Sequence, residues 1–317
     1  MSLTYDSLDA TTQSRFIPAL KDQIYESNIL LYRLLKKADN VGAKIGGTKV
    51  IEPLEYALST KVGSYSKGDA LTSADEEFIT AAEFDWKREH ADLYIDGLEE
   101  LENRGSARVI DLVAAKMKSA SKSLANAMAT QLFSDGTGNS GKDLIGLAAA
   151  VDDGTNVDAY GGIQRTDEGD AWWKSYYNTH ESNFTLARLR TAYSACRVSG
   201  DVPTLMISDS TEMNNYESIF LDTTNTLWVQ AMQPKVLDGS FQAYTFKGTP
   251  WVEDSHCTAK YLYMLNENYL QFRILRDFFN KGWQRPIDKD ELVSHIIWYG
   301  AFTGNNCRMS GKLVRTN

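Results

Sequence analysis

The sequence has little cysteine and no long apolar run. Its three cysteines, Cys196, Cys257 and Cys307, are too few and too scattered for a disulfide framework or a zinc site, and they fit a reducing cytoplasm. The longest apolar run, Leu144–Val151, is far shorter than the ~20 residues that span a bilayer. The first residues lack the cationic and apolar regions of a secretory signal. We therefore expect no membrane span and no export signal.

A basic excess is also missing, because the formal net charge is −9. A free-standing nucleic-acid binder needs a basic face to displace counterions, so the charge argues against that class. Apolar residues make up 43% of the chain and charged residues 24%, which excludes wholesale disorder. A length of 317 residues corresponds to about two domains at ~150 residues each.

Patterns typical of catalysis are lacking as well. The four histidines are isolated from one another in the sequence, and no G-x-S-x-G, HExxH or CxxC motif occurs. Gly136–Asp143 satisfies GxxxxGK, but Asp143 stands where a phosphate loop needs a hydroxyl, and a predicted helix precedes the segment where a strand is needed. We interpret it as a helix end followed by a turn. The sequence predicts no catalytic residue, cofactor or metal; a soluble hydrolase or nucleotide-binding enzyme stays open as an alternative of another class.

The acidic charge is concentrated in one segment. Asp69–Glu102 holds twelve acidic and two basic residues, a net charge of −10, whereas the rest of the chain carries +1. This segment is either a solvated face or an arm that lies on a basic neighbour. For the second reading the candidate acids are Asp75, Glu76 and Glu77. The candidate basic receivers are Arg33, Lys36 and Lys37, or Arg104 and Arg108.

Hydrophobic periodicity predicts a helix, an unusual hairpin and a long helix in the first half of the chain. The helix covers residues 13–38. The hairpin strands are residues 48–57, where Pro53 indicates an edge strand or an irregular one, and residues 78–95. The polar tip between them, Leu58–Glu77, is too long for a compact domain, so we expect the hairpin to project. The only sizeable apolar residues of the tip are Leu58, Val62, Tyr65 and Leu71. The apolar side chains of the hairpin strand, Phe84 and Trp86, then need a neighbouring subunit for burial.

The long helix is predicted over Leu98–Phe133, which corresponds to more than ~50 Å. The remainder is expected to be loop-rich over residues 139–181 and then mixed helix and strand, which makes an α+β chain. Lys247-Gly248 is predicted as the turn of a hairpin over residues 235–254, and Asp209 or Ser210 as the cap of a helix over Ser210–Phe220. Adjacent Trp172 and Trp173 face opposite ways in extended chain, so a second surface must cover at least one of them. They are either the edge of a core or an anchor at a subunit contact.

Three stretches resemble the major capsid proteins of tailed bacteriophages, which have the Hong Kong 97-type fold. The most specific is Tyr160–Arg165 (YGGIQR) followed by Trp172-Trp173. The other two are Lys49–Tyr56, and Gly248–Asp254 leading to Tyr261–Asn266. The order of elements is similar too, because this family has an N-terminal arm, an extended β-loop, a spine helix, a peripheral domain and an inserted axial domain.

The resemblance implies a domain division. It makes residues 1–38 the arm, 39–97 the extended β-loop and 98–189 the peripheral domain with its spine helix at 98–135. Residues 190–264 become the axial domain, and 265–317 return to the peripheral domain.

The implied function is structural. Copies of the chain assemble into pentamers and hexamers and close into an icosahedral shell around double-stranded DNA, without sequence-specific contacts. The partners are further copies, with separate scaffolding, portal and decoration proteins, and no membrane. The location is the virion, assembled in the cytoplasm of a bacterial host. The same fold also serves as an encapsulin-like nanocompartment, which is the alternative.

Overall fold

The structure is a computed structural model that describes residues 28–40, 47–71, 76–102, 106–167, 169–198, 200–221, 235–236 and 242–316. The first described helix, α3 (Ile29–Lys36), coincides with the last part of the helix predicted over residues 13–38. Residues 13–27 of that prediction lie outside the described residues. The apolar side of α3 is buried, because Ile29, Leu30 and Leu34 face the core.

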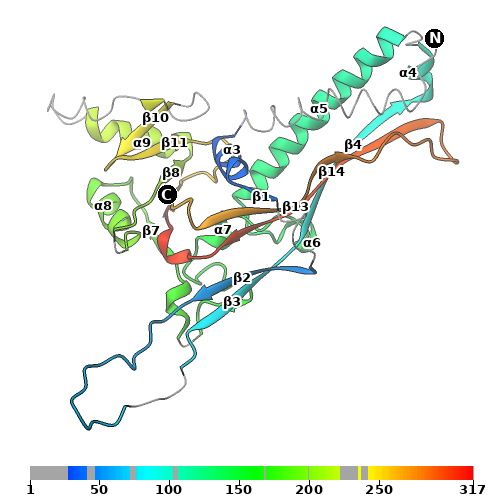
Figure 1. The fold of residues 1–317 in the computed structure, drawn as a ribbon. Helices are drawn as coiled ribbons and strands as arrows, with labels where there is room; N and C mark the ends of the chain where they lie inside the picture. Colours follow the sequence, from blue (N-terminus) through cyan, green and yellow to red (C-terminus); the bar gives the residue numbers. More distant parts are fainter. Residues whose placement is uncertain are drawn as a thin grey trace.

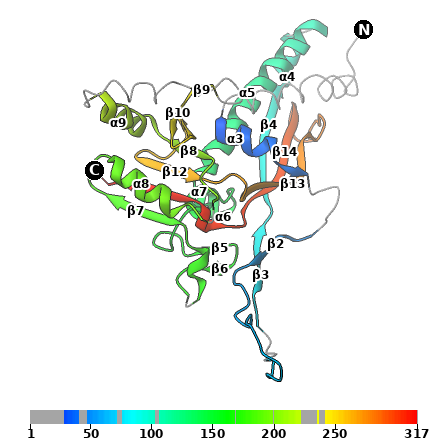
Figure 2. The same cartoon turned by 60° about the vertical axis from the view of Figure 1, so that its left-hand side comes forward.

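The predicted hairpin is present and projects from the body (Figures 1 and 2). It consists of β2 (Lys49–Glu55) and β3 (Ile79–Asp85), which form a separate antiparallel two-stranded sheet. Pro53 lies in β2, whose only described strand neighbour is β3, so it occupies an edge strand as predicted. The loop that joins the two strands extends away from every other element in both views.

The prediction of a single strand over residues 78–95 is wrong in one respect, because the chain forms two strands that are separated at Trp86. β3 ends before this residue, and β4 (Lys87–Asp96) begins after it and joins a different sheet. The indole N–H of Trp86 donates a hydrogen bond to the carbonyl oxygen of Gly47 (3.0 Å). The two halves divide because they pair with partners remote in sequence: β3 with β2, and β4 with β14 (Glu291–Gly304).

The four-stranded sheet has the order β1-β13-β14-β4, with β1 (Asp39–Asn40) and β13 (Leu270–Asn280) completing it. In the region of the predicted long helix the structure has α4 (Gly97–Glu102) and α5 (Ser106–Leu132), and both pack against β4. With 27 residues, α5 alone is about 40 Å long. Residues 103–105 of the predicted Leu98–Phe133 helix lie outside the described residues.

The segment after the spine helix is made of short elements, as predicted for residues 139–181. They are α6 (Gly138–Gly141), α7 (Leu147–Ala150), β5 (Ala159–Tyr160), β6 (Ile163–Gln164), the 3-10 helix η3 (Asp170–Trp173) and β7 (Tyr176–His180). Together they connect the C-terminal end of α5 to the second large sheet (Figure 1).

The second sheet has seven strands in the order β7-β15-β12-β8-β11-β10-β9. Its remaining strands are β8 (Leu205–Ser208), β9 (Lys235–Val236), β10 (Gln242–Phe246), β11 (Thr249–Glu253), β12 (Tyr261–Leu265) and β15 (Gly311–Arg315), and a 3-10 helix, η4 (Cys307–Met309), precedes β15. The predicted turn between β10 and β11 is present, with Lys247 and Gly248 at φ of 49° and 87°. Such left-handed pairs match the twist of a tight hairpin.

Two helices accompany this sheet, α8 (Leu186–Ala195) and α9 (Ser210–Leu221). Asp209 caps α9 by accepting a hydrogen bond from the backbone N–H of Glu212, as the sequence predicted. The described residues form two apolar cores. The larger lies around α5 and the four-stranded sheet, and the smaller contains Tyr193, Trp251 and Leu262. In the described ranges, no helix is both long enough and apolar enough to cross a membrane.

Candidate assembly surfaces

The hairpin loop carries an unusual number of exposed apolar side chains. Leu58 and Val62 expose 84% and 85% of their surface, and Tyr65 and Leu71 are similarly open. The sequence marked these four as the sizeable apolar residues of the tip. Large exposed apolar surfaces mark contact sites, and this one projecting loop presents four large apolar side chains. The loop therefore has the character of an assembly surface.

The loop is held in shape by Glu76 near its base. The Glu76 carboxylate accepts hydrogen bonds from the hydroxyl of Ser59 (2.6 Å), from the backbone N–H of Thr60 (3.1 Å) and from the hydroxyl of Thr60. These bonds, with Ser59 the largest contributor, lower the pKa of Glu76. On the facing side, the Tyr56 hydroxyl donates to the carbonyl oxygen of Glu77 (2.8 Å). Glu76, proposed as an acid for a neighbour, thus bonds across its own loop.

The prediction that Phe84 needs another subunit for burial is wrong. Phe84 is only 2% exposed within its own chain, and its ring meets Tyr160 edge-on at 5.1 Å. Trp86 is half-buried against the same core. The cause is the segment around Gly161, whose carbonyl oxygen accepts from the backbone N–H of Glu83 (2.9 Å). Sequence patterning shows which residues share a face, but it does not show that a segment about 75 positions later covers that face.

The two tryptophans have different surroundings. Trp173 is fully buried, and its indole N–H donates to the carbonyl oxygen of Tyr160 (3.0 Å), so it belongs to the core. Trp172 is half-buried and stacks on Tyr56 with ring centroids 5.3 Å apart. Within the chain, Trp172 therefore supports the root of the hairpin loop.

Arg165 is a structural residue that the analysis of the sequence missed. It is fully buried, and its guanidinium donates to the carbonyl oxygens of Ala149 (2.8 Å), Ala150 (2.8 Å) and Val157 (3.0 Å). Two of these carbonyls are at the end of α7, where helices leave acceptors unsatisfied. The sequence signal for its burial was its position between the Tyr160–Ile163 stretch and the Trp172-Trp173 pair.

Most described acids of the Asp69–Glu102 segment have partners in their own chain. Glu83 pairs with Lys49 (2.9 Å), Asp92 with His295 (2.7 Å) and Glu99 with Lys116 (2.5 Å). Asp69 accepts from the backbone N–H of Ser66 (2.6 Å). Asp75 lies outside the described residues. The intrachain pairs agree with the solvated-face reading for these acids, and Glu77 is left exposed at the base of the loop.

The candidate basic receivers differ from one another. Arg33 already has a partner in its own chain, because its guanidinium donates two hydrogen bonds to the buried Glu267 carboxylate, at 2.5 and 2.6 Å. Lys37, at the end of α3, is exposed, and so is Lys36, whose ammonium lies 5.9 Å from the Tyr32 ring centre. Arg104 and the side chain of Arg108 lie outside the described residues. We therefore no longer include Arg33 among the receivers.

The Gly136–Asp143 segment and the cysteine thiols, which could suggest catalysis, have structural surroundings in the described chain. The Gly136–Asp143 segment follows α5 and turns through left-handed residues, with Gly136 at φ 82° and Asn139 at φ 49°. Burial raises the pKa of Cys196 to about 12 and that of Cys307 to about 11, which disfavours the thiolate. Within the described part of the chain, no three His, Cys, Asp or Glu side chains gather into a metal site.

Comparison with known proteins gives matches in structure alone. No family profile and no curated protein matches the sequence. A chain of the Cyanophage A-1(L) capsid asymmetric unit is similar with a TM-score of 0.68 and 15% identity over 92% of both chains. A chain of Mycobacterium phage Bobi has a TM-score of 0.58 and 11% identity over 90% of both chains. The SrpI encapsulin complex of Synechococcus elongatus has a TM-score of 0.53 and 8% identity, covering 87% of this chain and 83% of that chain.

These similarities cover nearly the whole chain, so they concern its complete architecture. The protein has the fold of shell-forming proteins. More specifically, it is the α+β Hong Kong 97-type capsid fold that the resemblance in sequence predicted.

Proposed function

We propose that this chain is the major capsid protein of a tailed bacteriophage. Copies form pentamers and hexamers that close into an icosahedral shell around double-stranded DNA in the virion, after assembly in the cytoplasm of the host bacterium. The observation that carries the proposal is the projecting hairpin, whose loop exposes Leu58, Val62, Tyr65 and Leu71. Burial of such side chains stabilises association by about 25 cal/mol per Å². A neighbouring copy is the surface that a shell offers them.

In this proposal the parts of the chain have the roles that the resemblance implied. Residues 1–38 are the arm, 39–97 the extended β-loop, 98–189 and 265–317 the peripheral domain, and 190–264 the axial domain. The proposed role is structural, without catalysis. Scaffolding, portal and decoration proteins are the further partners that it implies.

An encapsulin-like nanocompartment is the second candidate. Its support is the similarity to the SrpI encapsulin, whose TM-score of 0.53 is lower than the 0.68 of the cyanophage capsid chain. The difference favours the capsid reading. The two candidates differ in cargo, which is nucleic acid in the first and protein in the second.

Electron microscopy of the purified full chain tests the proposal. We expect rings or closed particles, and nuclease-protected DNA in particles isolated from their natural source. Particles that enclose an enzyme and no nucleic acid would favour the nanocompartment. A homogeneous monomer at high concentration in several buffers would contradict both, and substrate turnover by that monomer would revive the enzyme alternative.

A further inference from the structure

His256 lies where three separate parts of the chain meet. It belongs to the loop between β11 and β12, and its Nε2 atom lies 2.7 Å from the side-chain oxygen of Asn126 in α5. Its Nδ1 atom lies 2.9 Å from the side-chain amide of Asn28, the residue that precedes α3. These two partners are 130 and 228 positions away in the sequence. One half-buried ring therefore connects α3, α5 and the β11–β12 loop.

The neighbours of Asn28 fix the orientation of its amide, which is buried. With its nitrogen toward Asp254, the amide donates to both carboxylate oxygens, at 3.0 and 2.6 Å, and its oxygen then faces Nδ1 of His256. The reverse orientation would place the amide oxygen against the carboxylate. Asn28 occupies the N-cap position of α3 but makes no side-chain cap bond there, so its amide serves this cluster.

Both ring nitrogens of His256 then face oxygen acceptors. A neutral imidazole has one N–H and can donate to one of the two amides, whereas the imidazolium donates to both. Turning the Asn28 amide round does not relieve the neutral ring, because the amide oxygen would then face Asp254. The arrangement of these side chains therefore fits the protonated histidine.

The charges around His256 favour the same form. The Asp254 carboxylate is 4% exposed, lies 3.5 Å from Nδ1 of His256 and accepts the backbone N–H of that residue (2.9 Å). Burial raises the pKa of Asp254, and the contacts with His256 oppose that rise. Burial, followed by the charges of Asp254 and Asp209, raises the pKa of the adjacent Cys257 thiol. Carboxylates thus outnumber the imidazole in this loop, and a buried carboxylate is costly without a positive partner.

The two helices face His256 with uncharged amides, and their nearest cations along the chain are placed elsewhere. Lys122 lies one turn before Asn126 on α5 and is exposed, so water screens its charge. Arg33, the first charged residue of α3, is paired with Glu267 (2.5 Å). The protonation of His256 is therefore decided mainly within its own loop.

We propose that protonated His256 fastens the start of α3 to α5 and to the second sheet, and that loss of its proton loosens this end of α3. Because the folded chain holds the charged ring, the attachment is complete at low pH and is lost as the pH rises. The change stays local, since α3 is also held by Arg33 and by its buried apolar side. This inference goes beyond the proposed function, because it concerns a pH-sensitive joint within a single chain.

Hydrogen exchange of α3 at two pH values tests the inference. Mass spectrometry of the purified full chain gives the exchange rate of the α3 peptide at pH 6.0 and 8.5, and each rate is divided by that of the unstructured peptide at the same pH. We expect this ratio to be about tenfold higher at pH 8.5, because one hydrogen bond to a charged group is lost. Equal ratios at the two pH values would overturn the inference.

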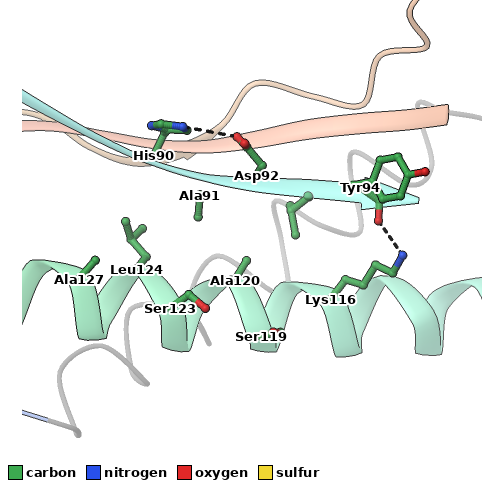
Figure 3. Close-up of a pocket in the computed structure, with 11 residues that line it drawn as sticks. His90, Ala91, Asp92, Tyr94, Lys116, Ser119, Ala120, Ser123, Leu124 and Ala127 are labelled. Carbon is green, nitrogen blue, oxygen red and sulfur yellow. Dashed lines mark hydrogen bonds and ion pairs between the residues drawn. The ribbon is translucent and has the colours of Figure 1, made fainter. Parts of the chain in front are cut away.

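Two substitutions of His256 separate its charge from its bulk. His256→Gln is uncharged, so α3 should exchange fast at both pH values, whereas His256→Arg keeps a charged donor and should hold α3 at both. The matched control is His90→Gln, which removes an exposed histidine beside Asp92 on β4 (3.8 Å; Figure 3) and should leave the pH dependence as in the parent chain. Parental pH dependence in His256→Gln would overturn the inference.

Asn126→Asp keeps the test valid if the His256 variants fold poorly. It places a carboxylate opposite Nε2 of His256, which favours the charged ring, so the pH at which α3 loosens should rise. A purely structural contact would not shift this midpoint, and an unchanged or lower midpoint would contradict the proposal. The exchange is measured whether or not the chain assembles, so its outcome is independent of the capsid proposal.

Discussion

The Arg273 guanidinium lies 2.7 Å from the Glu52 carboxylate, and this ion pair fixes the base of the projecting hairpin to the four-stranded sheet. Glu52 is in β2 and only 6% exposed, whereas Arg273 belongs to β13, more than 200 positions later. The Thr303 hydroxyl donates to the same carboxylate from β14 (3.2 Å). The hairpin therefore projects from a fixed root.

Removing the arginine should loosen that root. We expect Arg273→Met to lower the free energy of unfolding by about 1.5–3 kcal/mol, because it leaves a buried carboxylate without its charged partner. Urea unfolding measures the change, and limited proteolysis of the hairpin reports the loosening. The control is Lys49→Met, which removes the exposed partner of Glu83 and should have little effect. Equal stability of the two variants would contradict this role of Arg273.

The adjacent tryptophans should differ strongly in their contribution to stability. Trp173→Ala removes a fully buried side chain and its hydrogen bond to Tyr160, so we expect a loss of about 3–5 kcal/mol. Trp172→Ala should cost clearly less and should mainly increase cleavage near Tyr56, on which Trp172 stacks. Thermal unfolding of both variants checks the order, and equal losses would show that the two positions are not distinguished by burial.

The sequence predicted local structure well because periodicity and turn chemistry are local. The Lys247-Gly248 turn, the Asp209 cap and the edge position of Pro53 follow from properties of each residue and its near neighbours. The division at Trp86 and the burial of Phe84 depend on pairing with β14 and on packing against Tyr160, both remote in the chain. The sequence could not predict the partners of Arg33 and Arg273 for the same reason, because these partners are also remote in the chain. The projection of the hairpin was predicted from the length of its tip, whereas the degree of exposure of the apolar tip residues comes from the structure.

His180 should make stability depend on pH. Burial lowers the pKa of His180 in the folded chain, while its ring Nδ1 contacts the carbonyl oxygen of Ser182 (2.7 Å). The unfolded chain therefore binds the proton more readily, and stability is lost as pH falls through about 6.5, the ordinary value for histidine. We expect the free energy of unfolding to fall less between pH 7.5 and 5.5 in His180→Phe than in the parent chain. An unchanged pH dependence would contradict this account.

Charge reversal at the loop base should impair assembly at low salt. The variant is Asp75→Lys with Glu76→Lys and Glu77→Lys, which replaces three acids of the segment that carries a net charge of −10. Light scattering measures assembly, and part of the loss should return when Lys36 and Lys37 are changed to Glu. Glu76→Gln separates the effect of charge from that of the hydrogen bonds to Ser59 and Thr60. Normal assembly of the triple variant would mean that the acidic segment is only a solvated face.

The central claim is that the exposed apolar residues of the hairpin loop join copies into a shell. Its most direct test compares two matched double variants by light scattering and electron microscopy. Leu58→Ser with Val62→Ser changes the loop, and Leu98→Ser with Val202→Ser changes the same residue types where they are exposed elsewhere. We predict that both chains keep the parent circular dichroism, and that only the loop variant fails to form high-mass particles. Normal particles from the Leu58→Ser, Val62→Ser chain would contradict the account.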